Sequence, residues 1–468
     1  MRWVIFLFSV MLPVIAGCHS APTRLGEQVD PRSGDQKPEY SSKSDPTKAP
    51  NEIEFVGFEE TLPPPAPDPV LVIEDARVSE ALSLADLEGI AFQNNPTLTA
   101  ASARIQSARG RQVQAGLYPN PVIGYHGTEI GNRGTSGQQG GFISQRFITG
   151  GKLQLDQAIA GQEINEAHFR FHAQKQRVLN DVRVRFFEAL VAQRRVELTK
   201  ELVGIGENLV NATKKLLEGM QATENDLLQS EIRVENARIL HDNATNENVE
   251  AWRRLAAVIG VPHLEVRPLI GEPDSHLPDF EWQACYGEVL ANHPEVNAAR
   301  AKVERARIAV DRARREPIPN VDFSVSVRHI DLTDSDVANV QVGVPIPIFD
   351  KNQGNIGSAQ AEWVAVTREV ERVSLALQDQ FAVTFRRYAN ARQQVDRYSN
   401  NILPKSEKSL ELVTQGYEKG QVEYLTLLTA QQTFVEVSLS HLDAVRELRV
   451  ASTIIDGKLL TGSLDARK

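Results

Sequence analysis

The chain has 468 residues, a formal net charge of −10 and no cluster of basic residues, a balance that argues against nucleic acid as a partner. Aromatic residues make up 6% of the sequence, which suits long helices better than a globular core rich in aromatic side chains. The only cysteines are Cys18 and Cys285, so packing and not a set of disulfides has to stabilise the fold.

Residues 1–17 have the features of a secretory signal peptide, with Arg2 followed by an apolar run and two small residues before Cys18. The run is shorter than the roughly 20 apolar residues that span a bilayer, so we expect it to be removed. Residues 15–18 resemble a bacterial lipobox, in which the cysteine becomes the lipidated first residue. We therefore expect a lipid on Cys18 and no cofactor, the alternative being an ordinary signal peptide with an incidental cysteine. The next residue is His19 and not the aspartate that tends to mark inner-membrane retention, which favours the outer membrane.

Residues 18–75 are predicted to form the lipidated N-terminus and a flexible tether. This stretch is rich in Pro, Ser, Lys, Asp and Glu and shows no apolar periodicity. Such a composition cannot bury enough apolar surface to fold by itself.

The rest of the chain is predicted to be one structural unit built twice, over residues 76–270 and 271–468. Three features recur at a spacing of about 200 residues, which indicates an internal duplication. They are Asn95-Pro96 with His293-Pro294, Tyr118-Pro119-Asn120 with Ile318-Pro319-Asn320, and the turn Leu217-Glu218-Gly219 with Glu418-Lys419-Gly420. Each unit is expected to contain a helix, a strand pair and two long helices.

The second unit carries a clear β-hairpin pattern. In residues 321–328 apolar and polar residues alternate, so one face of the strand is apolar. The apolar residues, which we expect to face lipid, are Val321, Phe323, Val325 and Val327. A polar loop over 331–336 precedes a return strand at 340–346. Pro345 and Pro347 should mark the end of that strand, because proline cannot donate a ladder hydrogen bond.

The first unit carries a weaker hairpin pattern, at 121–129 and 142–147 around a glycine-rich loop over 131–141. Strands that are apolar on one face and polar on the other match a transmembrane β-barrel, with a half-buried soluble hairpin as the alternative. Even the smallest bacterial barrels need about eight strands, and this chain offers four. Either the chain does not span the membrane, or several chains share one barrel.

The helical pattern predicts very long helices. It is continuous and free of proline over 152–217, which at 1.5 Å per residue would be about 100 Å long, enough to bridge compartments. A heptad seam is expected at Leu198, Leu202, Ile205, Leu209, Ala212 and Leu216. A return helix is expected at 225–258. The second unit repeats the pair at 355–416, with a kink at Pro404, and at 422–459.

Taken together, these elements resemble the TolC family of outer-membrane efflux proteins, and within it the CzcC-like heavy-metal branch, over nearly all of residues 81–462. The most specific stretch is Val344–Ile356, which looks like the strand-to-helix junction of that branch, with Gln145–Lys152 as its counterpart in the first unit. The resemblance implies a mainly α fold in which three copies, with four strands each, close a twelve-stranded membrane β-barrel. Their long antiparallel helical hairpins would form a trimeric periplasmic α-barrel.

The same resemblance implies the exit duct of a tripartite efflux pump, with heavy-metal cations as the expected cargo. The expected partners are two further copies of the chain, a periplasmic adaptor protein, an inner-membrane pump of the resistance-nodulation-division type and outer-membrane lipid. The hairpin turns at Gly219 and at Gly416 and Gly420 would form the periplasmic tip that docks the adaptor, since glycine tolerates the positive φ of such turns.

A candidate gate also follows from the resemblance. Tyr417 matches the gating tyrosine of the best-known family members, but Val422 stands where they have an arginine. The positions of their acidic ring are Thr426 and Thr429 here, and Asp226 lies beside the matching acidic position of the first hairpin. A cation-binding constriction and a simply packed gate are both compatible with these residues.

The residues that could carry chemistry do not form an enzyme motif. His168 and His172 have a spacing that can chelate a metal, but no third ligand is evident, so we interpret them as solvated positions, with weak lumenal metal contact as the alternative. We expect no catalytic site and no resident metal. The alternative functions are an outer channel for drug efflux or type I protein secretion, because a fold does not define its cargo, and a periplasmic lipoprotein scaffold.

Overall fold

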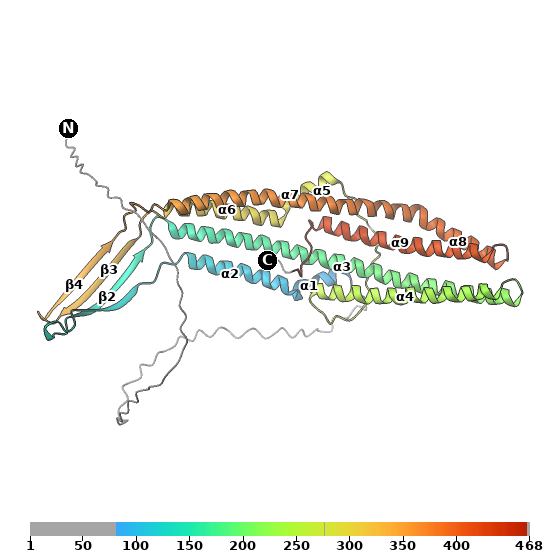
Figure 1. The fold of residues 1–468 in the computed structure, drawn as a ribbon, viewed down its shortest axis with the longest axis horizontal. Helices are drawn as coiled ribbons and strands as arrows, with labels where there is room; N and C mark the ends of the chain where they lie inside the picture. Colours follow the sequence, from blue (N-terminus) through green and yellow to red (C-terminus); the bar gives the residue numbers. More distant parts are fainter. Residues whose placement is uncertain (1–80, 276, 466–468) are drawn as a thin grey trace, which may run out of the picture. The chain divides into compact units, whose positions relative to one another are not determined.

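The structure is a computed structural model that describes residues 81–275 and 277–465. The predicted signal peptide, the tether over 18–75 and the lipidation site Cys18 lie outside the described residues. Within them, helices predominate and four strands form one sheet (Figure 1). None of the helices described is both long and apolar enough to cross a membrane.

The described elements occur in two runs with the same order of helices and strands, which we call the first half (84–259) and the second half (282–456). The first half comprises α1 (Leu84–Asn94), α2 (Pro96–Ala115), β1 (Val122–Thr128), the short 3₁₀ helix η1 (Asn132–Gly134), β2 (Gln138–Phe147), α3 (Lys152–Glu218) and α4 (Glu224–Ile259). The second half comprises α5 (Trp282–Asn292), α6 (Pro294–Arg315), β3 (Val321–Ile330), β4 (Ser335–Gly343), α7 (Gln353–Arg397), the π-helix η2 (Tyr398–Ile402), α8 (Leu403–Glu418) and α9 (Tyr424–Asp456).

The strands form an antiparallel sheet in the order β1-β2-β3-β4, so the contact between β2 and β3 joins the two halves. Two strands begin earlier than predicted, β2 at Gln138, inside the expected glycine-rich loop, and β4 at Ser335. The backbone ladder continues there through glycine and polar residues, which an apolar side-chain pattern does not mark. β4 ends at Gly343, short of the predicted end at residue 346 but before Pro345, as expected for a residue that cannot donate.

The register gathers apolar residues of all four strands on one face of the sheet. Cross-strand partners share a face, as do residues two apart along a strand. The rows on this face are Ile123-Ile143-Val325-Val340, Gln145-Phe323-Val342 and Tyr125-Gly141-Val327-Ala338. The opposite face holds the row Ser144-Ser324-Gln341 and an ion pair in which Nε of Arg146 lies 2.7 Å from Oδ1 of Asp322. Val321, Phe323, Val325 and Val327 thus share the apolar face, and its contact with lipid stays a prediction.

Two separate apolar cores hold the long helices together, one in each half. In the first, Val182 and Phe186 of α3 pack in one cluster with Leu255 of α4. In the second, Phe381 of α7 shares a cluster with Leu448 of α9. α3 runs unbroken for 67 residues, which confirms the predicted helix of about 100 Å.

The heptad seam of α3 departs from the prediction at one of its positions. Leu202 and Leu209 are buried, but Ile205 is 37% exposed. α4 approaches α3 at Gly206, where an added Cβ would lie 3.1 Å from Cγ2 of Val234. Because glycine has no side chain to hold α4 away, the seam steps four residues from Leu202 to Gly206 and not three residues to Ile205.

The second half differs from the first because its long helix is interrupted. α7 passes into the π-helical turn η2, and the first turn of α8 contains Pro404. Proline lacks an N–H for the carbonyl of residue 400 and its ring crowds that carbonyl, so the widened turn accommodates it. Across the turn, Oγ of Ser399 lies 3.0 Å from Nε2 of His441 on α9. The predicted irregularity at Pro404 is confirmed.

Equivalent caps begin α2 and α6. Asn95 accepts the N–H two residues ahead on Oδ1 (3.0 Å) and donates from Nδ2 to the carbonyl of Val258 (2.7 Å) at the end of α4. Nδ1 of His293 accepts the N–H of Glu295 (3.2 Å), and Nε2 lies 3.0 Å from the carbonyl of Lys458 after α9. Because Nδ1 accepts, the neutral ring carries its proton on Nε2, and burial lowers the pKa of His293.

His293→Asn should make the fold less sensitive to acid. A protonated ring cannot accept the N–H of Glu295, and the pKa of His293 lies below the value of about 6.5 that histidine has in the unfolded chain. The contribution of the cap, on the order of 1 kcal/mol, is therefore present above pH 6.5 or so and lost as the pH falls through the lower pKa of the folded state. Thermal unfolding followed by circular dichroism at neutral and acidic pH should show a smaller loss of Tm in the variant. The matched change Asn95→His should increase the loss of Tm on acidification. An equal loss of Tm in the wild-type protein and both variants would contradict this prediction.

Candidate functional site

The turns of the two long hairpins have the same hydrogen bonds but different residues. The carbonyl of Leu216 accepts the N–H of Gln221 at 2.7 Å in the first turn. The carbonyl of Gly416 accepts the N–H of Gln421 at 2.8 Å in the second. Equivalent residues of the two turns are therefore 200 positions apart in the chain. The sequence comparison, which matched Gly219 with Gly420, had used a spacing of 201.

This register corrects the expected role of Gly219. Gly219 has φ −80°, whereas the next residue, Met220, has φ 57°. Met220 is the equivalent of Gly420 in the second turn, which has φ 69°. The residue with positive φ is therefore a glycine in the second turn and a methionine in the first, so the first turn does not use the conformational freedom of Gly219. Gly416 is needed for a close approach, since an added Cβ would lie 2.6 Å from Cγ2 of Val422.

Tyr417 lies in a small cluster, the tip cluster, that joins the two hairpins. Its other buried members are Leu209 of α3 and Leu427 of α9. Oη of Tyr417 lies 3.3 Å from Oγ1 of Thr213, a fully buried residue of α3. Its ring centroid is 5.8 Å from that of Tyr424. Tyr417 was expected at the tip from the sequence, whereas Thr213 and Tyr424 were not, although Tyr424 follows Tyr417 at a heptad spacing across the turn.

Tyr424 contributes a buried polar atom to the tip cluster. Its hydroxyl is shielded from solvent and has no hydrogen-bond partner in the part of the chain that the structure describes. Burial raises the pKa of Tyr424 to about 12, the neighbouring Tyr417 acts in the same direction, and Arg233 opposes it. The hydroxyl is therefore uncharged at neutral pH.

The other candidate gate residues lie outside the tip cluster. Thr426 and Thr429 are exposed on the first turns of α9, and Oγ1 of Thr429 donates to a carbonyl of its own helix. The carboxylate of Asp226 accepts the N–H (2.9 Å) and the hydroxyl (2.8 Å) of Thr223 and so caps α4. Within one copy, the contacts described for Tyr417 are aromatic, aliphatic and hydroxyl groups. A role of Thr426, Thr429 and Asp226 around a pore stays a prediction.

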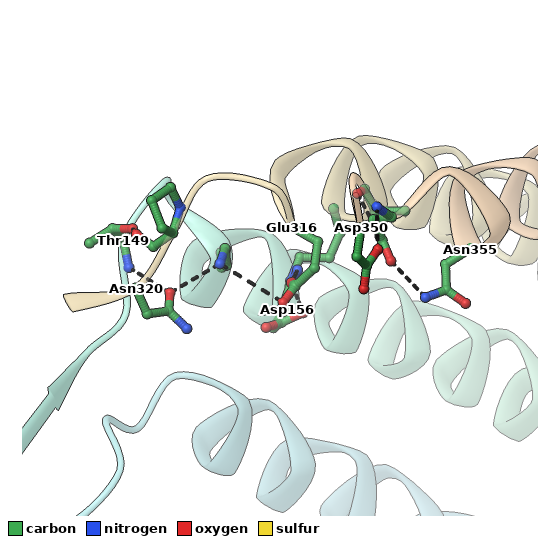
Figure 2. A network of polar contacts seen from close by, with 11 residues as sticks. Thr149, Asp156, Glu316, Asn320, Asp350 and Asn355 are labelled. Carbon is green, nitrogen blue, oxygen red and sulfur yellow. Dashed lines mark hydrogen bonds and ion pairs between the residues drawn. The ribbon is translucent and has the colours of Figure 1, made fainter. Parts of the chain in front are cut away.

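At the junction of sheet and helices, side chains of the first half contact the loop of the second half that precedes β3 (Figure 2). Lys152 is 2% exposed, and its Nζ donates to Oδ1 of Asn320 at 3.0 Å. The N–H of Thr149 approaches the same oxygen at 3.3 Å, and its hydroxyl donates to the carbonyl of Pro319 at 2.5 Å. A carboxylate oxygen of Glu316 lies 3.9 Å from the ammonium group. The buried charge therefore has both an amide oxygen and a carboxylate as partners.

The two predicted junction sequences adopt the same helix start. Gly151 before α3 and Asn352 before α7 both have left-handed backbone conformations, with φ 71° and 60°. Nδ2 of Asn352 donates to the carbonyl of Ala313 at 2.8 Å, and Oδ1 of Asp350 accepts the N–H of Asn352 at 2.8 Å (Figure 2). These stretches are thus the two places where a strand leads into a long helix.

Beyond the junction, a series of ion pairs, the inter-half ladder, joins α3 to α6. The pairs are Asp156 with Arg312 (2.8 Å), Glu163 with Arg305 (3.7 Å), Glu166 with Lys302 (3.8 Å) and Arg177 with Glu295. The side chains of these pairs are between 6% and 37% exposed, so solvent screens their attraction only in part. The acidic residues of α3 meet basic residues of α6 and Arg177 meets an acidic one, so the ladder sets the register of the two helices.

The structure does not assemble a metal centre from the residues it describes. Over 81–275 and 277–465, no group of three or more His, Cys, Asp and Glu side chains is placed to hold a metal ion. His168 and His172 lie one turn apart on α3, and neither belongs to such a group.

Comparison with known proteins relates both halves to one family. The family model for outer membrane efflux proteins matches residues 89–261 and 285–455. The cobalt-zinc-cadmium resistance protein CzcC of Cupriavidus metallidurans is 26% identical over 390 residues, covering 80% of this chain and 89% of that protein. The nickel and cobalt resistance protein CnrC of the same organism is 26% identical over 287 residues, covering 60% and 67%.

Solved structures share the fold. A crystal structure of CusC, reported for its transmembrane channel formation, has a TM-score of 0.69 at 17% identity and covers 81% of this chain and 92% of that one. The outer membrane protein VceC of Vibrio cholerae has a TM-score of 0.66 at 16% identity, covering 81% and 96%.

Tyr417→Ala should loosen the tip. Removing a buried aromatic side chain costs about 3–5 kcal/mol in a core, whereas Tyr417→Phe, which removes only the hydroxyl beside Thr213, should cost about 1 kcal/mol. Hydrogen exchange of the backbone over residues 410–430 should therefore accelerate strongly in the alanine variant and little in the phenylalanine variant. Exchange in α1, which lies outside the tip cluster, serves as the internal control. Unchanged protection in the alanine variant would show that Tyr417 does not hold the tip.

Proposed function

We propose a function for this chain, which belongs to the outer membrane efflux protein family. It is the outer-membrane channel of a tripartite efflux pump and passively conducts heavy-metal cations. One observation carries the proposal. A four-stranded sheet with an apolar face and two open edges leads directly into a helix of 67 residues, about 100 Å long. A sheet at the outer membrane and a helix of that length together reach from the membrane deep into the periplasm.

The open edges of the sheet require further copies. In hydrocarbon every backbone N–H and C=O needs a partner, so β1 and β4 cannot stay unpaired there. Three copies would supply twelve strands and close a barrel. The apolar face with Val325 would then contact lipid, and the polar face with Ser324 would line the lumen.

The cargo follows from the relatives. CzcC and CnrC are named for resistance to cobalt, zinc, cadmium and nickel, and CzcC matches four fifths of this chain. We assign metal cations to this channel on that basis, together with the junction sequences at 145–152 and 344–356. Conduction needs no catalytic residues, so the chain would be a conduit and not an enzyme.

The remaining parts of the proposal concern partners and anchoring. The hairpin turns at Gly219, Gly416 and Gly420 would dock a periplasmic adaptor, which connects the channel to an inner-membrane pump of the resistance-nodulation-division type. A lipid on Cys18 would anchor the N-terminus in the outer membrane. At the tip we favour a packed gate over a charged ring, because the contacts of Tyr417 are uncharged.

Deleting the gene should sensitise the host cell to one or a few metals, such as cobalt, zinc, cadmium, copper or silver, more than to drugs. Without an exit duct, cations delivered by the pump would remain in the periplasm. Growth in graded metal concentrations, with the wild-type gene restored as the control, measures this. Equal or greater sensitisation to dyes and detergents would identify a drug channel, and no sensitisation to either would favour the scaffold.

Val325→Arg should impair assembly, whereas Ser324→Arg should be tolerated. An arginine on the lipid face costs about 2–4 kcal/mol near the middle of the bilayer, while the same residue on the polar face only narrows the lumen. The two positions are adjacent on β3, so each variant is the control for the other. Native mass spectrometry of the channel extracted in detergent would measure the fraction of trimer. The opposite result would mean that the inner and outer faces are reversed.

A further inference from the structure

We infer that the second half binds an anionic phospholipid where the sheet meets the helices, with Arg314, Arg315 and Lys351 on the phosphate and Phe349 beside the acyl chains. We call these four residues the junction patch. The inference rests on the proposed function, since it needs the sheet to lie in a membrane. It adds a class of ligand, a leaflet of the membrane and the residues that hold the headgroup.

The two arginines of the junction patch differ from the other basic residues of α6. The earlier basic residues of that helix all contact an acidic or amide side chain, namely Arg300, Lys302, Arg305, Arg307 and Arg312. Arg314 and Arg315, the last two residues of the helix, are exposed and make no ion pair or side-chain hydrogen bond within residues 81–275 and 277–465. The ammonium group of Lys351 is exposed and without a partner in the same part of the chain. Three charges are thus available to a ligand.

Helix dipoles do not account for all three charges. A cation at the C-terminal end of a helix, such as Arg314 or Arg315 on α6, is favourable. Lys351 instead lies two residues before the first residue of α7, at an N-terminal end, where the dipole disfavours a cation. The neighbouring carboxylate of Asp350 accepts the N–H of Asn352 at 2.8 Å. Even with Asp350 counted against the three cations, the patch keeps a net positive charge.

A hydrogen bond between two elements fixes the junction patch. Nδ2 of Asn352 donates to the carbonyl of Ala313 at 2.8 Å and so holds the segment before α7 against the last turn of α6. Lys351 and Arg314 are the chain neighbours of these two residues, so their charges come from different elements but lie in one region. Glu316, which follows the arginines, is already engaged in ion pairs with α6 and α3.

The first half does not have these charges at the equivalent positions. By the spacing of the two Pro-Asn sequences, the counterparts of the two arginines are Gln114 and Ala115. The residue before the left-handed helix start is Lys351 in the second half and Gly150 in the first. Both halves nevertheless lead from a strand into a long helix in the same way, so the fold does not need the three charges. A ligand of the second half accounts for them.

Uncovered apolar side chains lie beside the charges. Phe349 is 90% exposed, the highest value for an aromatic residue in the described part of the chain, and Ile348 is 63% exposed. Both follow β4, whose valines lie on the apolar face of the sheet. Exposure of such side chains to water is unfavourable. A membrane interface would cover them, and aromatic rings are typical of the interface of a β-barrel.

The position of the junction patch indicates the periplasmic leaflet. In the proposed channel the sheet lies in the hydrocarbon and the long helices lie in the periplasm, so the patch lies at the headgroups between them. Arginine can bind a phosphate there through two parallel N–H donors. At the other end of the sheet, the hairpin of β3 and β4 carries Asp331, Asp334 and Asp336, so the two ends differ in charge. We therefore assign the patch an anionic phospholipid such as phosphatidylglycerol.

Lipid binding to the full chain, extracted in detergent, tests the inference. Native mass spectrometry in dilute ammonium acetate would compare bound phosphatidylglycerol with bound phosphatidylethanolamine, which has no net charge. The wild-type protein should prefer phosphatidylglycerol by about tenfold, because basic side chains at a membrane surface attract anionic lipid. The patch variant, which replaces the three cations by glutamine, should lose most of this preference. Its substitutions are Arg314→Gln, Arg315→Gln and Lys351→Gln.

A control variant removes the same charge elsewhere. It changes exposed basic residues of α2, α4 and α8 that lie outside the junction patch, and it should keep the preference for phosphatidylglycerol. Its substitutions are Arg104→Gln, Arg253→Gln and Lys405→Gln. Phe349→Ser should weaken the binding of both lipids and leave the preference between them unchanged. Circular dichroism would establish that all variants keep the helical fold.

Three results would overturn the inference while the channel proposal stands. The first is an equal preference in the patch variant and the wild-type protein. The second is displacement of phosphatidylglycerol by millimolar inorganic phosphate, which would identify a site for free phosphate. The third is a loss of trimer in Phe349→Ser with unchanged lipid binding, which would show that a neighbouring copy covers Phe349. A wild-type protein that binds neither lipid and does not sediment with outer membranes would contradict the channel proposal as well.

Discussion

The fold depends on a buried ammonium group at the point where the sheet turns into helices. Burying the charge of Lys152 would cost several kcal/mol without partners, and Asn320 and Glu316 supply them. Lys152 is the first residue of α3, Asn320 directly precedes β3, and Glu316 directly follows α6. This one contact therefore places a helix and a strand of different halves beside each other. The pairing of β2 with β3 and the ladder between α3 and α6 continue from it in opposite directions.

The two halves share an architecture but have diverged at equivalent positions. The caps Asn95 and His293 perform the same task with an amide and an imidazole. α3 is unbroken, whereas its counterpart is divided by η2 before it reaches Tyr417. The tip cluster thus connects a continuous helix to an interrupted one.

Much of this structure could be predicted from the sequence, because long helices and one-sided strands leave periodic patterns. The helix over 152–217, the irregularity at Pro404 and the shared face of the β3 valines were all expected. The predictions from the sequence were wrong where backbone hydrogen bonds or the lack of a side chain determine the geometry. Polar and glycine residues extend β2 and β4 through backbone bonds, and Gly206 moves the helix seam because it has no side chain.

The candidate site was less predictable than the fold, because its contacts join residues far apart in the chain. Thr213 meets Tyr417 across 204 positions, and no local pattern indicates that pair.

The length of α3 means that a small rotation at one end becomes a large displacement at the other. A rotation of one degree about the junction would move the far end of a helix about 100 Å long by about 2 Å, roughly the difference between a packed and a separated pair of side chains. The polar contacts beside the sheet therefore act, together with the packing along the helices, on the position of hairpin turns that lie about 100 Å away.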